Sequence, residues 1–92
     1  MKYTIQFERN VLLDFKSHKA YYNHISQKLG TNFDNEFWQK IDYIKNYPLH
    51  HRVRYRSIRI AILKIYPFGI HFIIEGDTIL ILKLLHFKQF YK

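Results

Sequence analysis

The sequence has 92 residues, with 15 Lys and Arg against 7 Asp and Glu, so its net charge is +8 before its six histidines are counted. This length fits one domain over residues 1–92, and a hydrophobic content of 48% supplies a core and argues against disorder. The absence of cysteine excludes disulfides, thiolate zinc sites and cysteine nucleophiles. A pI near 9.8 indicates an anionic partner.

No segment has the pattern of a signal peptide or a membrane-spanning helix. Residues 1–8 alternate polar and apolar side chains instead of forming an apolar run. The longest apolar stretch, residues 78–85, is interrupted by Lys83 and is far shorter than the roughly 20 residues that cross a bilayer. We therefore expect a cytoplasmic protein without a membrane partner.

The first half of the chain has the pattern of one strand and two helices. Residues 2–8 alternate apolar and polar side chains, which is typical of a half-buried strand. From Val11 the apolar positions recur every three or four residues and predict a helix that ends at Gly30. A second helix begins with Thr31 as its cap and ends before Pro48. Its apolar stripe is Phe33, Phe37, Ile41 and Ile44.

The second half returns to the alternation of strands after a loop over residues 47–53. It predicts strands over residues 58–65, 70–75 and 78–86, with turns between them. The last strand places His86 on the same face as Leu80, Leu82 and Leu84. The order is strand, helical hairpin and three-stranded antiparallel meander (β-α-α-β-β-β), an α+β fold of two layers. One sheet face is then covered by the helices, and the other is the expected working surface.

Basic residues concentrate in the second half of the chain. Residues 1–47 carry seven basic and five acidic side chains, whereas residues 48–92 carry eight and two. The guanidinium fork suits phosphate, so a dense arginine cluster on the sheet predicts contact with phosphate or with an acidic partner. A basic strand edge can also serve only against aggregation. The cluster consists of Arg52, Arg54, Arg56 and Arg59.

Five short segments are distinctive in their order and spacing: Tyr21-Tyr22, Tyr55-Arg56-Ser57-Ile58-Arg59, Tyr66-Pro67-Phe68-Gly69-Ile70, Ile74-Glu75-Gly76-Asp77 and Leu84-Leu85-His86. Together they resemble the RelE/ParE superfamily, the small bacterial toxins of type II toxin-antitoxin pairs. The resemblance covers nearly the whole chain and implies the same fold. It also implies a cognate antitoxin as partner and no cofactor.

The superfamily divides by target. RelE-like members cleave mRNA, most of them at the ribosome, whereas ParE-like members inhibit DNA gyrase without known catalytic residues. The sequence favours ribosome-dependent RNA cleavage slightly. Non-enzymatic inhibition of gyrase is the alternative, and an inactive module that only binds antitoxin is a third possibility.

Metal-independent RNA cleavage needs an acid, a base and cations around the phosphate. We expect His86 to act as acid or base beside Arg56 and Arg59, although a histidine at a sheet rim is often only structural. The remaining candidates for nucleic-acid contact are Arg52, Arg54, Lys64 and Lys83, with Phe90 and Tyr91 to stack on a base. Exposed aromatic residues of the helices, Tyr21, Trp38 and Tyr43, are candidates for antitoxin contact. No chelating spacing of histidines predicts a metal site.

Overall fold

The computed structural model describes residues 2–90, and the side chains of residues 2–88. Its elements in chain order are β1 (Thr4–Phe7), α1 (Val11–Ile25), α2 (Gln27–Asn46), the 3-10 turn η1 (Pro48–His50), β2 (Val53–Tyr55), β3 (Ile58–Ile62), β4 (Phe68–Glu75), β5 (Thr78–His86) and α3 (Phe87–Phe90). None of the helices in this part of the chain is both long enough and apolar enough to cross a membrane.

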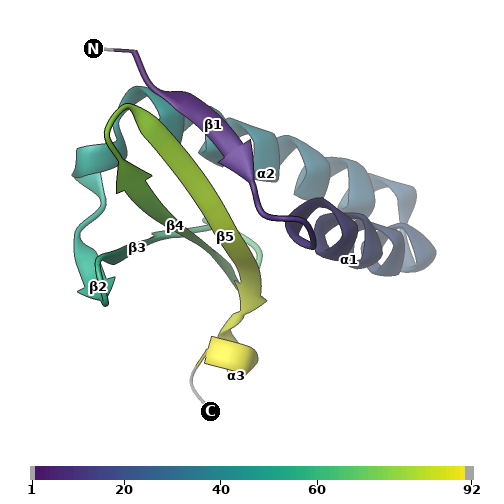
Figure 1. Ribbon diagram of the computed structural model, residues 1–92. Coiled ribbons are helices and arrows are strands. Elements are labelled where there is room, and N and C mark those ends of the chain that lie inside the picture. The colour runs from purple at the N-terminus through teal and green to yellow at the C-terminus, as the bar shows by residue number, and fades with distance from the viewer. Residues whose placement is uncertain (1, 91–92) are drawn as a thin grey trace.

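The strands form one sheet in the order β1-β5-β4-β3-β2. β1 runs parallel to β5, and the other neighbours are antiparallel. The hairpin of α1 and α2 forms a second layer on one side of the sheet (Figure 1). The predicted α+β fold with two layers is therefore confirmed, and β2 is a short additional strand at the sheet edge.

The boundary between the two long helices differs from the prediction. Helix α1 ends at Ile25, and Ser26 caps α2 because its hydroxyl oxygen accepts a hydrogen bond from the backbone N–H of Leu29 at 3.2 Å. Gly30 lies inside α2 and is buried. A Cβ at this position would lie 3.1 Å from the Cα of Asn23 in α1. The glycine thus permits close packing of the two helices and does not end the first one.

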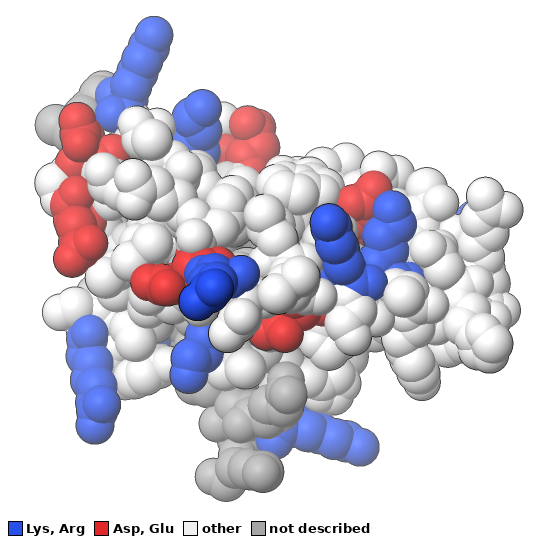
Figure 2. Space-filling model, turned by 45° about the vertical axis from the view of Figure 1, so that its right-hand side comes forward, with Lys and Arg blue, Asp and Glu red and all other residues white. Residues whose placement is uncertain are grey.

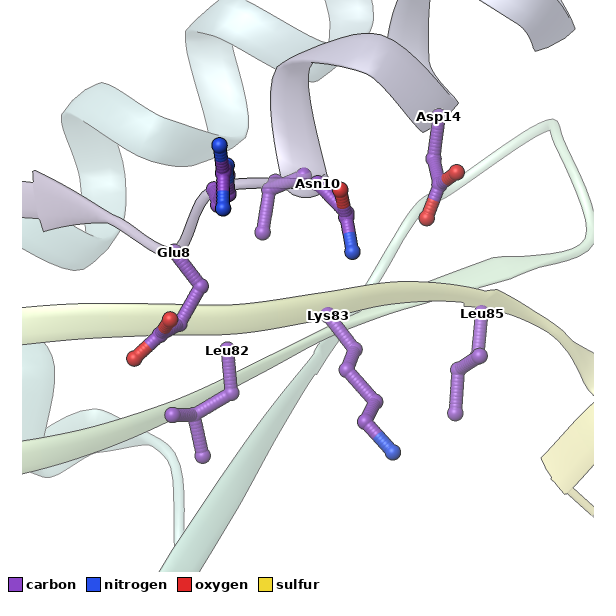
Figure 3. A pocket seen from close by; sticks show the side chains of 8 residues that line it. Glu8, Asn10, Asp14, Leu82, Lys83 and Leu85 are labelled. Atoms are coloured by element: carbon purple, nitrogen blue, oxygen red, sulfur yellow. The ribbon is translucent and has the colours of Figure 1, made fainter.

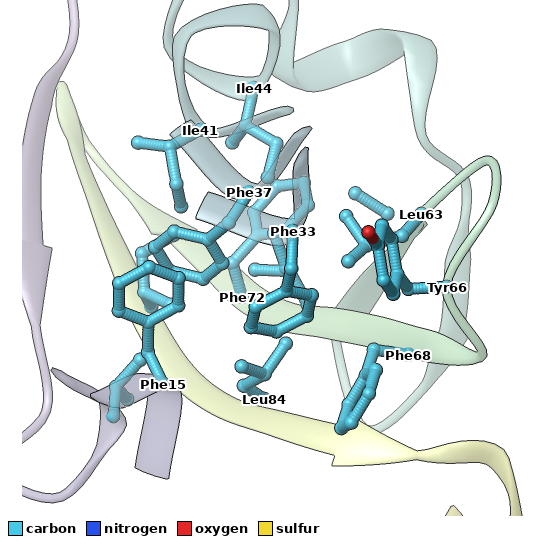
Figure 4. Close-up of a cluster of buried hydrophobic side chains, with 14 of the residues drawn as sticks. Phe15, Phe33, Phe37, Ile41, Ile44, Leu63, Tyr66, Phe68, Phe72 and Leu84 are labelled. Atoms are coloured by element: carbon cyan, nitrogen blue, oxygen red, sulfur yellow. The ribbon is translucent and has the colours of Figure 1, made fainter. Parts of the chain in front are cut away.

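The core lies between the helices and the sheet, as Figure 4 shows. All four residues of the predicted α2 stripe are buried. Phe15 of α1 stacks on Phe37 of α2 with ring centroids 4.2 Å apart. Apolar side chains from the two central strands complete the cluster, namely Phe68, Ile70, Phe72, Ile79, Ile81 and Leu84.

A bulge in β5 reverses the alternation of its side chains. Residue His71 of β4 lies opposite Lys83, while Phe72 lies opposite Ile81, so Leu82 is an extra residue in β5. Ile81 and Leu84 therefore both face the helices. The prediction that His86 shares a face with Leu80 and Leu82 is wrong, because the bulge moves His86 to the helix-covered side.

Candidate functional site

The sheet face that α1 and α2 leave uncovered is apolar at its centre. We call it the uncovered sheet face. Cross-strand rows run Ile60–His71–Lys83 and Ile62–Gly69–Leu85 over β3, β4 and β5. In Figure 3 the side chains of Leu82, Lys83 and Leu85 all point away from α1. The rows and strand alternation assign these apolar side chains to the face: Ile60, Ile62, Ile73, Leu80, Leu82 and Leu85.

The four clustered arginines do not share this face. Arg54 lines a small hollow on it together with His71 and Leu85. Arg59 lies opposite Phe72, a core residue, and its Nη1 donates a hydrogen bond to the carbonyl oxygen of His51 at 2.6 Å. Alternation along β3 thus turns Arg59 toward the helix-covered side. The expectation of a single cationic surface is corrected to an apolar face with cations beside it.

The other predicted cations are dispersed. Arg52 and Arg56 are exposed, and Arg56 lies in the turn between β2 and β3 with a φ of 46°. Lys64 lines a different hollow, on the helix side, with Glu36 and Tyr43. Figure 2 shows Lys and Arg side chains separated by neutral surface and accompanied by acidic side chains on the face in view. Two of the predicted phosphate contacts, Arg54 and Lys83, therefore both lie beside His71.

His86 lies apart from the arginines expected to work with it. It pairs with Phe68 at the start of β4, whereas Arg59 pairs with Phe72, four residues further along that strand. The His86 ring is 5.2 Å from the ring of Phe68, on the helix-covered side. The structure thus does not bring His86 together with Arg56 and Arg59. The side chain of Phe90 and all of Tyr91 lie outside the described residues.

A pair that the sequence analysis missed occupies the uncovered sheet face. The Tyr55 hydroxyl lies 3.1 Å from Nδ1 of His71, joining β2 to β4. His71 is only 1% exposed although it lies on the face that α1 and α2 leave uncovered, and Phe87 of α3 lines the hollow beside it. Burial lowers the pKa of His71, and the charge of Lys83 lowers it further, so the ring is neutral at pH 7. The sequence held a signal for this placement. Side chains alternate along β4, so a core position at Ile70 puts His71 on the opposite face of the sheet.

The chemistry of this cluster suits an anion. Arg54 and Lys83 supply two cations beside the neutral imidazole of His71, and the Tyr55 hydroxyl can donate or accept a hydrogen bond. The hollow shared by Arg54 and His71 measures only about 10 Å³ in this conformation. The arrangement therefore fits surface contact with a phosphate or carboxylate better than enclosure of a substrate.

The aromatic residues proposed for antitoxin contact lie on the helices. Tyr21 is the most exposed at 64%, followed by Trp38 at 42% and Tyr43 at 40%. The Trp38 ring packs edge-on against Phe7, Phe15 and Phe37, so it is partly a core residue. The Tyr43 hydroxyl forms a hydrogen bond with Nδ1 of His50 at 2.8 Å. Tyr21 is accordingly the one best placed for a partner.

No cluster of three or more metal-ligating side chains is present within residues 2–88. Comparison of the sequence with protein-family models and with curated proteins gave no match. Among solved structures, the fold is similar to a chain of the chromosomal ParDE TA system from P. aeruginosa, with a TM-score of 0.81. The two chains are 16% identical, and the alignment covers 92% of this chain and 96% of that one. This likeness confirms the RelE/ParE-like fold.

Proposed function

We propose that this protein is the growth-inhibiting toxin of a toxin-antitoxin pair, held inactive by a cognate antitoxin. The observation that carries the proposal is the fold shared over 92% of the chain with a component of the ParDE TA system. The apolar uncovered sheet face adds support, because exposed apolar patches often mark protein interfaces. Arg54 and Lys83 beside that face favour a partner segment that is apolar with acidic residues.

For its mode of action we propose inhibition of DNA gyrase by binding, without catalysis. The expected ribonuclease site required His86 beside Arg56 and Arg59, and these residues lie apart. The separation supports the binding mode over the RNA cleavage that the sequence favoured slightly. On this proposal the uncovered sheet face, or the helical hairpin with Tyr21, makes the contact with gyrase.

RNA cleavage at the ribosome is the second candidate, and one cluster favours it. Neutral His71 could accept the proton of a 2′-hydroxyl while Arg54 and Lys83 hold the phosphate. On this scheme Nδ1–H of His71 donates to the Tyr55 hydroxyl oxygen, which makes Nε2 the proton acceptor. Cleavage on this scheme needs no metal.

The first experiment separates toxin from inactive module. Induced expression in a bacterial host should stop growth, and co-expression of a cognate antitoxin should restore it. Growth that continues unchanged at confirmed protein levels would overturn the toxin proposal and leave the inactive antitoxin-binding module.

The second experiment separates the two modes of action. Purified protein should inhibit DNA supercoiling by gyrase, and mapping of mRNA 5′ ends after induction should show no new cuts. His71→Phe, which keeps a ring of similar size, should remain toxic if binding is the mechanism. New codon-linked cuts that disappear in His71→Phe, with supercoiling intact, would establish the nuclease instead.

A further inference from the structure

A groove lies on the helix-covered side of the sheet, between α1 and the end of β5. Its volume is about 560 Å³, within the range of small-molecule sites. Of the residues that line this groove, only Tyr21 has a role in the function proposed above. The residues that matter here are His18, Tyr21, Tyr22, Phe68, His86 and Lys88.

Two imidazoles from distant parts of the chain meet in this groove. His18 of α1 and His86 of β5 both pack against the ring of Phe68, with ring centroids 4.5 Å and 5.2 Å from it. Burial lowers the pKa of His18, the carboxylate of Asp14 opposes this, and the nearby His86 lowers it again. The two rings are therefore close enough to repel each other when both are protonated.

The groove carries cationic groups and no carboxylate among the described residues that line it. Lys88 follows β5 and adds a permanent charge. Three groups that are positive or can become positive are an unfavourable set unless an anion neutralises them. His18 is half-buried and lines the groove.

The hydrogen bonding of His86 fixes its tautomer. The backbone N–H of Lys88 donates to Nδ1 of His86 at 3.1 Å, so the proton of the neutral ring is on Nε2. A donor at Nε2 matches an acceptor such as a phosphate oxygen. In the same groove, the exposed ring of Tyr21 is set edge-on against Tyr22, with centroids 5.4 Å apart, and offers an aromatic surface.

We propose that this groove binds a nucleoside monophosphate, with the phosphate held by His18, His86 and Lys88 and the base against Tyr21. The mainly apolar walls with a few convergent polar groups are typical of a small-ligand site. Every nucleobase has a flat face that can stack on an aromatic ring, so the contact at Tyr21 does not select one base. The site is independent of the toxin proposal.

The test is a titration of the histidine imidazoles by NMR, with adenosine 5′-monophosphate, inorganic phosphate and adenosine as separate probes. The monophosphate should raise the pKa of His18 by about half a pH unit or more, because an anion favours the protonated ring. The monophosphate should also change the imidazole NMR signals of His86. The signals of His24 and His50, which are exposed outside the groove, should stay unchanged. Inorganic phosphate should act more weakly, and adenosine should perturb Tyr21 alone.

Variants make the assignment specific. His18→Gln and His86→Gln should each weaken binding of the monophosphate at least tenfold, while His24→Gln on the same helix should not change it. Unchanged circular dichroism would show that each variant is folded. Equal shifts at all histidines, or no shift at saturating monophosphate, would overturn the site. Equal affinity for phosphate and monophosphate would overturn the role of Tyr21. Growth inhibition is measured separately, so its outcome does not bear on this test.

Discussion

A carboxylate of α2 ties the helical layer to the loop between β3 and β4. The Glu36 carboxylate accepts hydrogen bonds from the backbone N–H groups of Lys64 and Ile65, the latter at 3.1 Å from Oε2. Both N–H groups donate to Oε2, and Ile65 also lies 3.3 Å from Oε1; in Glu36→Gln the amide oxygen can replace Oε2, but the NH₂ then replaces Oε1 beside the N–H of Ile65. The change therefore turns both charge-assisted hydrogen bonds into neutral ones and replaces the second acceptor of Ile65 by a donor.

The expected cost is about 1 to 2 kcal/mol of unfolding free energy, since hydrogen bonds to charged groups contribute about 1.5 to 3 kcal/mol and this loop is exposed. For a domain of this size each kcal/mol lowers the melting temperature by about 4 to 8 °C. Thermal and urea unfolding followed by circular dichroism would measure both quantities.

The matched control is Asp42→Asn on the same helix. The Asp42 carboxylate accepts a hydrogen bond from the side-chain amide of Asn46 at 3.3 Å, and both residues are exposed. We expect this change to cost less than about 0.5 kcal/mol. If Glu36→Gln proved no more destabilising than Asp42→Asn, the inferred tie between α2 and the loop would be wrong.

Three further predictions follow from the core, the histidines and the uncovered sheet face. Phe37→Ala should lower the unfolding free energy by about 3 to 5 kcal/mol in urea denaturation, because the Phe37 ring is fully buried. Burial lowers the pKa of His51 and His71, so below about pH 6.5 the unfolded chain binds more protons than the folded one. The free energy of unfolding should therefore fall as the pH falls below about 6.5, by at most about 1.4 kcal/mol per pH unit for each proton. Denaturation midpoints that do not change between pH 7 and pH 5 would contradict this. Ile62→Lys should preserve the melting temperature and abolish growth inhibition if the uncovered sheet face is the docking surface, whereas Ile65→Lys in the β3–β4 loop should preserve both.

The local patterns of the sequence determined most of the fold. The stripe from Phe33 to Ile44 is buried as the helical period required, and the alternating segments became strands. Gly30 was misread because a glycine can end a helix or admit a neighbouring backbone, and only the position of Asn23 in α1 distinguishes the two roles. The repeat of apolar residues along a helix or strand depends on residues close together in the sequence, so it can be recognised without the tertiary structure, whereas the helix boundary at Ser26 was not recognised.

The placement of the candidate site depended on contacts between distant segments. The extra residue Leu82 in β5 is defined only by pairing with β4, and it decided that His86 faces the helices. The contact between Tyr55 and His71 likewise exists only because β2 and β4 belong to one sheet. The sequence by itself determined composition, charge, helices and strands, whereas strand register decided which side chains meet, since a shift of one residue moves a side chain to the opposite face.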